Sequence, residues 1–138
     1  SVKQVVGWAK ENMESSYLTN IRWIVEDALR FAEREARRGN KYNAIILDPP
    51  SYGIGPNGER WKLEDNLNEL MKNAISILEP KTHCLILNTY SLNLSPFILK
   101  NLATSLYNDK GEVETGELVV PSESGFELPL GSYLRIVK

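Results

Sequence analysis

Apolar and polar residues follow two different periods along this chain, and the changes between them divide it into helices and strands. Apolar residues at helical spacing predict a first helix from Val2 to Met13 and a second one that follows Asp27. Asp27 suits the N-cap of that second helix, and Gly39 suits the left-handed residue that ends it. Between the two helices, residues 19–27 are rich in β-branched and aromatic side chains, which predicts a short strand.

The middle of the chain contains two apolar runs with a long helix between them. Residues 43–48 read Asn-Ala-Ile-Ile-Leu-Asp, and residues 83–90 form a similar run. Continuous apolar runs of this length are typical of strands covered on both faces, as in parallel sheets. Between these runs, apolar residues recur at helical spacing from Leu63 to Leu78 and predict the clearest helix of the chain.

The last third predicts one more helix and a pair of strands. Ser95 and Pro96 suit an N-cap and a first helical position, so a helix is expected from there to Leu106. Two strands, at 116–120 and 131–138, have no helix between them and should form an antiparallel hairpin with a long loop. Strands that alternate with helices predict one α/β domain over residues 1–138, with a mostly parallel sheet and helices on both faces.

Composition and charge narrow the classes of function. The net charge of -2 leaves no overall positive field to attract nucleic acid, although it does not exclude a local basic patch. The single cysteine, Cys84, cannot form an internal disulfide, which fits a cytoplasmic protein. No apolar run approaches the roughly 20 residues that span a bilayer, so no membrane partner is expected. The N-terminus shows no signal-peptide pattern.

The candidate chemistry lies directly after the strand at 43–48, in the sequence Asp48-Pro49-Pro50. In open α/β sheets, ligands bind beyond the carboxyl ends of the strands. The two prolines restrict the backbone and donate no hydrogen bonds, so this turn should present a carboxylate and outward carbonyl oxygens. Such acceptors suit the N–H groups of an amine, and Tyr52 could stack on a planar ring. Taken alone, the tripeptide fits a simple strand terminator equally well.

Several other residues are of types that can take part in catalysis or binding, but their sequence context indicates structural roles. His83, the only histidine, enters a buried strand, where a histidine is more often structural than catalytic. The basic helix end at 34–41 is offset by Glu33 and Glu35, and cations are favourable at a helix C-terminus. Trp61 precedes the long helix and suits a hydrophobic staple. Gly55 and Gly58 lack the Lys-Ser/Thr of a phosphate-binding loop, and we predict no metal site.

The segment RWIVEDALRFAEREARRGNKYNAIILDPPSYGIGPNGERWKLEDNL, residues 22–67, resembles the class I S-adenosylmethionine-dependent methyltransferases. It is most similar to the branch that contains the ribosomal large-subunit RNA methyltransferases. That branch typically shows an Arg-Trp strand, an acidic residue before Ala, and Asp-Pro-Pro followed by a small or basic residue, an aromatic residue and Gly. The later segment LILNTYS, residues 85–91, matches the strand and loop after the next helix. The resemblance implies a Rossmann-like fold and S-adenosylmethionine as the cofactor.

The resemblance also implies roles for particular residues on the cofactor side. Asp27 would accept a hydrogen bond from the adenine amino group, and the backbone amide of Ala28 would contact the adenine ring. Ser1 would lie near the ribose, and Asp48 would border the methyl donor. No metal ion takes part in this chemistry.

On the acceptor side, the resemblance places Asp48, Pro49 and Pro50 between the methyl donor and the acceptor base. Tyr52 would pack on that base, and residues 88–91 would line the far side of the pocket. The chemistry is an in-line displacement in which the enzyme chiefly positions the two reactants. Methyltransferases that act on carbon 5 of pyrimidines need a cysteine nucleophile, and relatives that use one carry it in the loop after LILN. This chain has none there, which favours an amine or ring nitrogen.

The family's glycine-rich turn and the acidic end of its second strand have no counterpart before the first helix. By resemblance, the chain is therefore expected to be the C-terminal part of a methyltransferase domain, without the N-terminal strands. Open strand edges invite pairing with other chains. We expect the isolated fragment to be inactive, to bind S-adenosylmethionine weakly and to self-associate.

The resemblance thus predicts S-adenosylmethionine-dependent methyl transfer to a nucleobase, with ribosomal RNA as the partner of the full-length protein. Two alternatives stay open. The same fold could act on a small molecule or a protein side chain, and a half-domain could serve as a non-catalytic interaction module.

Overall fold

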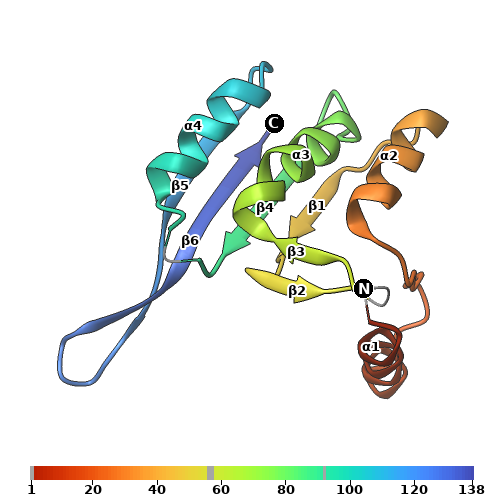
Figure 1. Ribbon diagram of the computed structural model, residues 1–138, viewed down its shortest axis with the longest axis horizontal. Helices are drawn as coiled ribbons and strands as arrows, with labels where there is room; N and C mark the ends of the chain where they lie inside the picture. The colour runs from red at the N-terminus through yellow and green to blue at the C-terminus, as the bar shows by residue number, and fades with distance from the viewer. Residues whose placement is uncertain (1, 56–57, 92) are drawn as a thin grey trace.

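The computed structural model describes residues 2–55, 58–91 and 93–138 of the chain (Figure 1). Its main sheet has four strands in the order β1-β4-β6-β5. Their bounds are Ala44–Leu47 for β1, Cys84–Thr89 for β4, Glu127–Val137 for β6 and Glu112–Pro121 for β5. β1 pairs with β4 in parallel, whereas β6 is antiparallel to both β4 and β5. The predicted α/β fold and its antiparallel C-terminal hairpin are confirmed.

The three predicted capping residues, Asp27, Gly39 and Ser95, stand at helix ends. Asp27 accepts a hydrogen bond from the amide of Arg30 at 3.1 Å, and Ser95 accepts one from the amide of Ile98 at 3.4 Å. Gly39 ends its helix in the left-handed conformation, with φ of 71°. The helix bounds are Lys3–Ser15 for α1, Ala28–Arg38 for α2, Leu63–Ser76 for α3 and Pro96–Leu106 for α4.

The hydrophobic core lies between one face of the sheet and helices α3 and α4. Leu85 and Leu87 of β4, with Leu134 and Ile136 of β6, are fully buried there. Alternate residues of a strand point to opposite faces. The other face of β4 therefore carries Cys84, Ile86 and Asn88, which are only half-buried. Helices were predicted on both faces of the sheet. In the described residues, however, the hydrophobic core forms on one face only.

The prediction of a strand at residues 19–27 is wrong, because this stretch pairs with no strand in the described chain. A strand needs partners for its backbone groups, and α1 and the following segment lie away from the four-stranded sheet (Figure 1). Ile21, Trp23 and Val25 consequently remain exposed. The indole Nε1 of Trp23 donates a hydrogen bond to the Sδ of Met13 at 3.3 Å, which ties the segment to α1.

A small hairpin follows β1 where the sequence suggested only a glycine-rich loop. β2 (Tyr52–Ile54) pairs antiparallel with β3 (Arg60–Lys62). The amide of Gly55 donates to the carbonyl of Glu59 at 2.7 Å and closes the hairpin. The hairpin lies at the carboxyl end of β1 (Figure 1), so it forms part of the surroundings of Asp48.

The C-terminal strands are longer than predicted. β5 and β6 stay paired as far as Pro121 and Glu127, which reduces the predicted loop at 121–131 to a turn at 122–126. Figure 1 shows this end of the hairpin projecting well beyond the rest of the sheet. We call residues 118–130 the hairpin arm.

A buried carboxylate fastens α2 to the segment that leads into β1. Glu35 is buried and accepts hydrogen bonds from the hydroxyl of Tyr42 and from Nδ2 of Asn40, both at 2.7 Å. Arg38 forms an ion pair with the same carboxylate at 3.2 Å. These interactions, led by the hydrogen bond from Tyr42, lower the pKa of Glu35 from 4.5 to about 2.

The variant Glu35→Gln is expected to lower the free energy of unfolding at neutral pH. Because the folded pKa is depressed, the stabilisation by Glu35 is fully present above pH 4.5 and is lost as the pH falls toward 2. The difference between wild type and variant should therefore shrink over this range. Denaturant unfolding at several pH values measures it, with the exposed neighbour variant Glu33→Gln as control. A difference that does not change with pH would contradict this assignment.

Candidate functional site

Polar side chains gather where β1 and β4 end, at one edge of the sheet. The parallel register pairs Leu47 with Leu87, so Asp48 follows β1 at the level where Asn88 continues β4. The carboxyl ends of neighbouring parallel strands meet at the same edge, which is where open α/β sheets bind ligands. Asp48 and residues 88–91, predicted to flank one pocket, therefore lie at the same edge of the sheet.

The hydroxyl of Tyr90 interacts with the carboxylate of Asp48. This interaction, followed by partial desolvation and the charge of Asp48, raises the pKa of Tyr90. The phenol therefore remains protonated and acts as the donor at neutral pH. Both side chains are exposed. Since an ionised carboxylate has about four acceptor positions, Asp48 can still accept N–H groups from a ligand.

The turn at Pro49 and Pro50 is fixed by contacts that sequence reasoning missed. The indole Nε1 of Trp61 donates to the carbonyl of Pro50 at 2.8 Å, and the amide of Leu63 donates to the carbonyl of Ser51 at 3.0 Å. The prediction of outward carbonyl oxygens at this turn is therefore wrong for Pro50, whose carbonyl bonds within the protein. Trp61 also packs on the core, so it braces the turn as well as the helix.

Tyr52 is placed as a surface aromatic beside this turn. It opens β2 opposite Lys62, and 57% of its surface is exposed. A ring that is exposed at the end of a hydrogen-bonded hairpin can stack on a flat ligand without first leaving the protein core. Tyr52 thus has the exposure that its predicted role requires.

A second carboxylate anchors the loop that carries Tyr90. Glu64, in the first turn of α3, accepts hydrogen bonds from Oγ of Ser91 at 2.7 Å and from Nδ2 of Asn93 at 3.1 Å. These two bonds, Ser91 first, lower the pKa of Glu64, and Lys62 adds an ion pair at 3.5 Å. The sequence did not predict this role for Glu64. An acidic residue at a helix N-terminus is already explained by its favourable interaction with the helix dipole.

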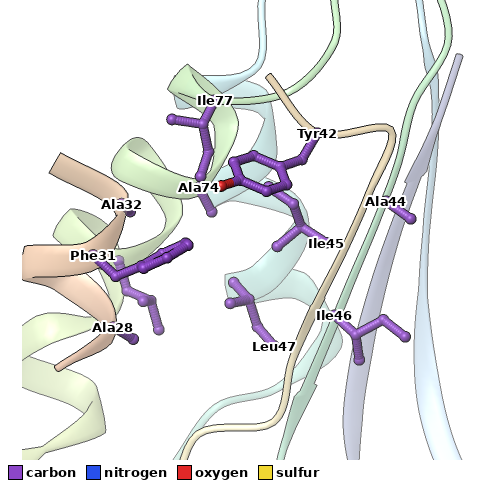
Figure 2. Close-up of a pocket in the computed structure, with 11 residues that line it drawn as sticks. Ala28, Phe31, Ala32, Tyr42, Ala44, Ile45, Ile46, Leu47, Ala74 and Ile77 are labelled. Carbon is purple, nitrogen blue, oxygen red and sulfur yellow. The ribbon is translucent and has the colours of Figure 1, made fainter. Parts of the chain in front are cut away.

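The predicted cofactor residues Asp27 and Ala28 form the N-terminus of α2. One carboxylate oxygen of Asp27 caps the helix, which leaves the second oxygen for a ligand. Ala28 is the first residue of α2, where the backbone amide has no partner within the helix. Ala28 lies at the same end of an apolar groove as Leu47, the neighbour of Asp48 (Figure 2). Ser1 lies outside the described residues.

This apolar groove has a volume of about 260 Å³ and runs between α2, α3 and β1 (Figure 2). In the described chain, β1 is paired with β4 on one edge only, and 71% of Ile46 is exposed. The groove and the free edge of β1 together form an uncovered apolar surface. The groove is lined by Ala28, Phe31, Ala32, Tyr42, Ala44, Ile45, Ile46, Leu47, Leu70, Ala74 and Ile77.

His83 lies at the amino end of β4, opposite the edge where Asp48 lies. It is buried, with Nδ1 at 2.6 Å from the carbonyl oxygen of Glu79 and Nε2 at 2.9 Å from the hydroxyl of Tyr107. Nδ1 therefore carries the proton and donates it, while Nε2 accepts from the phenol. These contacts agree with the structural role that the sequence favoured.

Within residues 2–55, 58–91 and 93–138, no three His, Cys, Asp or Glu side chains are grouped so that they could hold a metal ion. None of the helices in these ranges has the length and apolar character needed to cross a membrane.

Comparison with solved structures finds the same fold in methyltransferases. A SAM-dependent methyltransferase from Agrobacterium tumefaciens aligns with a TM-score of 0.89 and 36% identity, over 99% of this chain and 46% of that protein. SMU.776, provisionally assigned as a methyltransferase and complexed with SAH, has a TM-score of 0.78 and 19% identity, over 99% and 37%. A provisionally assigned SAM-dependent methyltransferase from Streptococcus mutans has a TM-score of 0.76 and 17% identity, over 99% of this chain and 36% of that protein. The chain spans less than half the length of these three proteins.

No protein-family model and no curated protein matches the sequence. The match at 36% identity nevertheless confirms the resemblance to class I S-adenosylmethionine-dependent methyltransferases, and all three matches confirm the Rossmann-like fold. The cofactor dependence of the Agrobacterium protein agrees with the cofactor predicted for this chain. The narrower resemblance to the ribosomal RNA branch, and the roles of individual residues, stay predictions.

Proposed function

We propose that this chain forms the acceptor side of a methyltransferase domain that transfers a methyl group from S-adenosylmethionine to a nitrogen of a nucleobase in ribosomal RNA. The observation that carries the proposal is the carboxylate of Asp48 directly after β1, where it interacts with Tyr90, followed by the exposed ring of Tyr52 at the start of β2. The cofactor is supported by the 36% identity to a SAM-dependent methyltransferase.

The N-terminus of α2 fits the adenine of this cofactor. The amino group of adenine is a donor and the adjacent ring nitrogen is an acceptor. Asp27 offers a carboxylate oxygen that is not used for capping, and Ala28 offers a backbone N–H that the helix leaves unpaired. The two groups are neighbours in the chain and have the complementary order of acceptor and donor.

At the acceptor side, Asp48 would accept an N–H of the base and so orient the nitrogen lone pair. S-adenosylmethionine supplies an electrophilic methyl group on a sulfonium. Tyr52 would stack on the base, while Pro49 and Pro50 keep the turn stiff. The contribution of these residues is mainly positioning. The loop at 88–96 contains no cysteine, which disfavours the covalent route to carbon 5 of a pyrimidine.

We further propose that the free edge of β1 and the apolar groove are covered, in the working enzyme, by further strands of the same methyltransferase domain. The proposal is supported by the exposure of Ile46 and by the greater length of the matched proteins. Cofactor contacts beyond Ser1, Asp27, Ala28 and Asp48, and contacts to the RNA beyond the acceptor base, would come from that part. The absence of an internal disulfide favours the cytoplasm as the compartment.

A protein consisting of residues 1–138 alone is therefore expected to bind S-adenosylmethionine more weakly than about 1 mM and to self-associate through the groove. Calorimetry measures the affinity, and sedimentation velocity measures the oligomeric state. Ile46→Lys, which places a charge at the free edge of β1, should reduce the self-association. Micromolar cofactor binding by a monomer of these residues would refute the proposed division of the domain.

The proposed substrate is tested with a protein that carries the whole methyltransferase domain. It is incubated with S-adenosylmethionine labelled in the methyl group and with separated ribosomal RNA, transfer RNA and protein fractions. Label is expected in the ribosomal RNA, and RNA affinity should fall with increasing salt. Label confined to protein or to small molecules would contradict the proposed RNA substrate, whereas the cofactor assignment would still hold.

A further inference from the structure

The hairpin arm presents apolar side chains to solvent. Phe126 is 78% exposed, Leu128 62% and Val120 47%. Val120 and Leu128 are paired across the two strands and so share a face, and Phe126 lies in the turn directly before β6. Apolar side chains that cluster on an exposed hairpin are characteristic of an interaction surface.

The charges around these apolar residues are all negative. Glu117, Glu123 and Glu127 lie on or beside the arm, and residues 111–134 contain no lysine, arginine or histidine. In the described chain, β5 is paired only with β6, so its outer edge still offers backbone N–H and carbonyl groups. The arm therefore combines apolar area, negative charge and an open strand edge.

These three features decide between possible occupants. The phosphates of a nucleic acid would be repelled by the glutamates. A second copy docked edge to edge would bring the same acidic side chains together, and like charges that face each other across strands are destabilising. A basic segment is attracted by the charges, covers the apolar side chains and can use the free backbone groups.

We infer that the hairpin arm binds an extended, basic segment of a partner protein, in which lysine or arginine alternates with apolar residues, as an added strand beside β5. β5 and β4 are both antiparallel to β6, so their carboxyl ends point the same way. The arm thus projects from the edge at which Asp48 lies, and the bound segment runs along the acceptor side of the molecule. This inference does not depend on the proposed methyl transfer.

The test measures binding of a fluorescent ten-residue peptide of alternating lysine and valine, which equals β5 in length, by anisotropy. The full chain should bind it with an affinity that falls as salt is added, and it should not bind the matching glutamate–valine peptide. The triple variant E117Q/E123Q/E127Q and the double variant F126S/L128S should each bind about tenfold more weakly. Phe97→Ser, at an equally exposed apolar residue on α4, should bind like wild type.

A photo-crosslinking version of the lysine–valine peptide provides a test that needs no variant, and its crosslinks should map to residues 112–130. Equal binding of both peptides, wild-type affinity of the arm variants or crosslinks elsewhere would overturn the inference. A dimer that the arm variants dissociate would show that a second copy covers the arm. An RNA oligonucleotide that binds wild type and loses affinity for the same variants would overturn it too.

Discussion

Replacing Asp48 by asparagine, in a protein with the whole methyltransferase domain, is expected to lower the turnover number about a hundredfold to ten-thousandfold. The amide has almost the same shape but no negative charge, and one of its two polar atoms donates instead of accepting. It would therefore fail to orient an acceptor N–H and would lose the charged partner of Tyr90. Steady-state methyl transfer measures the turnover number.

The cofactor affinity of Asp48→Asn should fall much less than its turnover, because Asp48 only borders the methyl group and the adenine contacts of Asp27 and Ala28 are unchanged; calorimetry checks this. Tyr90→Phe leaves the carboxylate in place and should cause a smaller loss, since it removes only the hydroxyl that interacts with Asp48. Asp65→Asn, at an exposed carboxylate of α3, is the matched control. Wild-type turnover by Asp48→Asn would remove Asp48 from the mechanism.

Gly131→Ala is expected to lower the free energy of unfolding by about 3 kcal/mol, a sum of backbone strain and overpacking. The φ of Gly131 is 152°, a conformation that residues with a side chain rarely adopt. A Cβ at this position would overlap the carbonyl oxygen of Thr89, which is fully buried. Because backbone atoms cannot move aside as a flexible side chain can, β6 would have to separate from β4. Denaturant unfolding measures the loss.

Gly7→Ala provides the comparison, because a Cβ at Gly7 meets nothing within 4 Å and the residue lies inside α1. It should leave the stability unchanged or raise it by up to about 1 kcal/mol. Gly131→Ala should also disturb the site, because Thr89 precedes Tyr90 and pairs with Ser132. If both alanine variants were equally stable, the close approach of β6 to Thr89 would not exist in solution.

Local chemistry in the sequence predicted the helices well. Asp27, Gly39 and Ser95 perform their capping roles, because a cap depends on a few neighbouring residues and on backbone conformation. The apolar run at 83–90 predicted β4 for a similar reason, since burial shows directly in composition. Local signals failed at 19–27, because β-propensity does not provide a partner strand.

By itself, the sequence determined the α/β class, the positions of most helices and strands, and the location of Asp48 at the end of a strand. Only the tertiary structure decided what surrounds Asp48. The interaction of Tyr90 with Asp48, the contact between Trp61 and Pro50, and the anchoring of Ser91 by Glu64 join residues 11 to 42 positions apart. No periodicity reports such pairs, since they arise from strand register and helix packing, and the projection of the hairpin arm likewise depends on how far β5 and β6 remain paired.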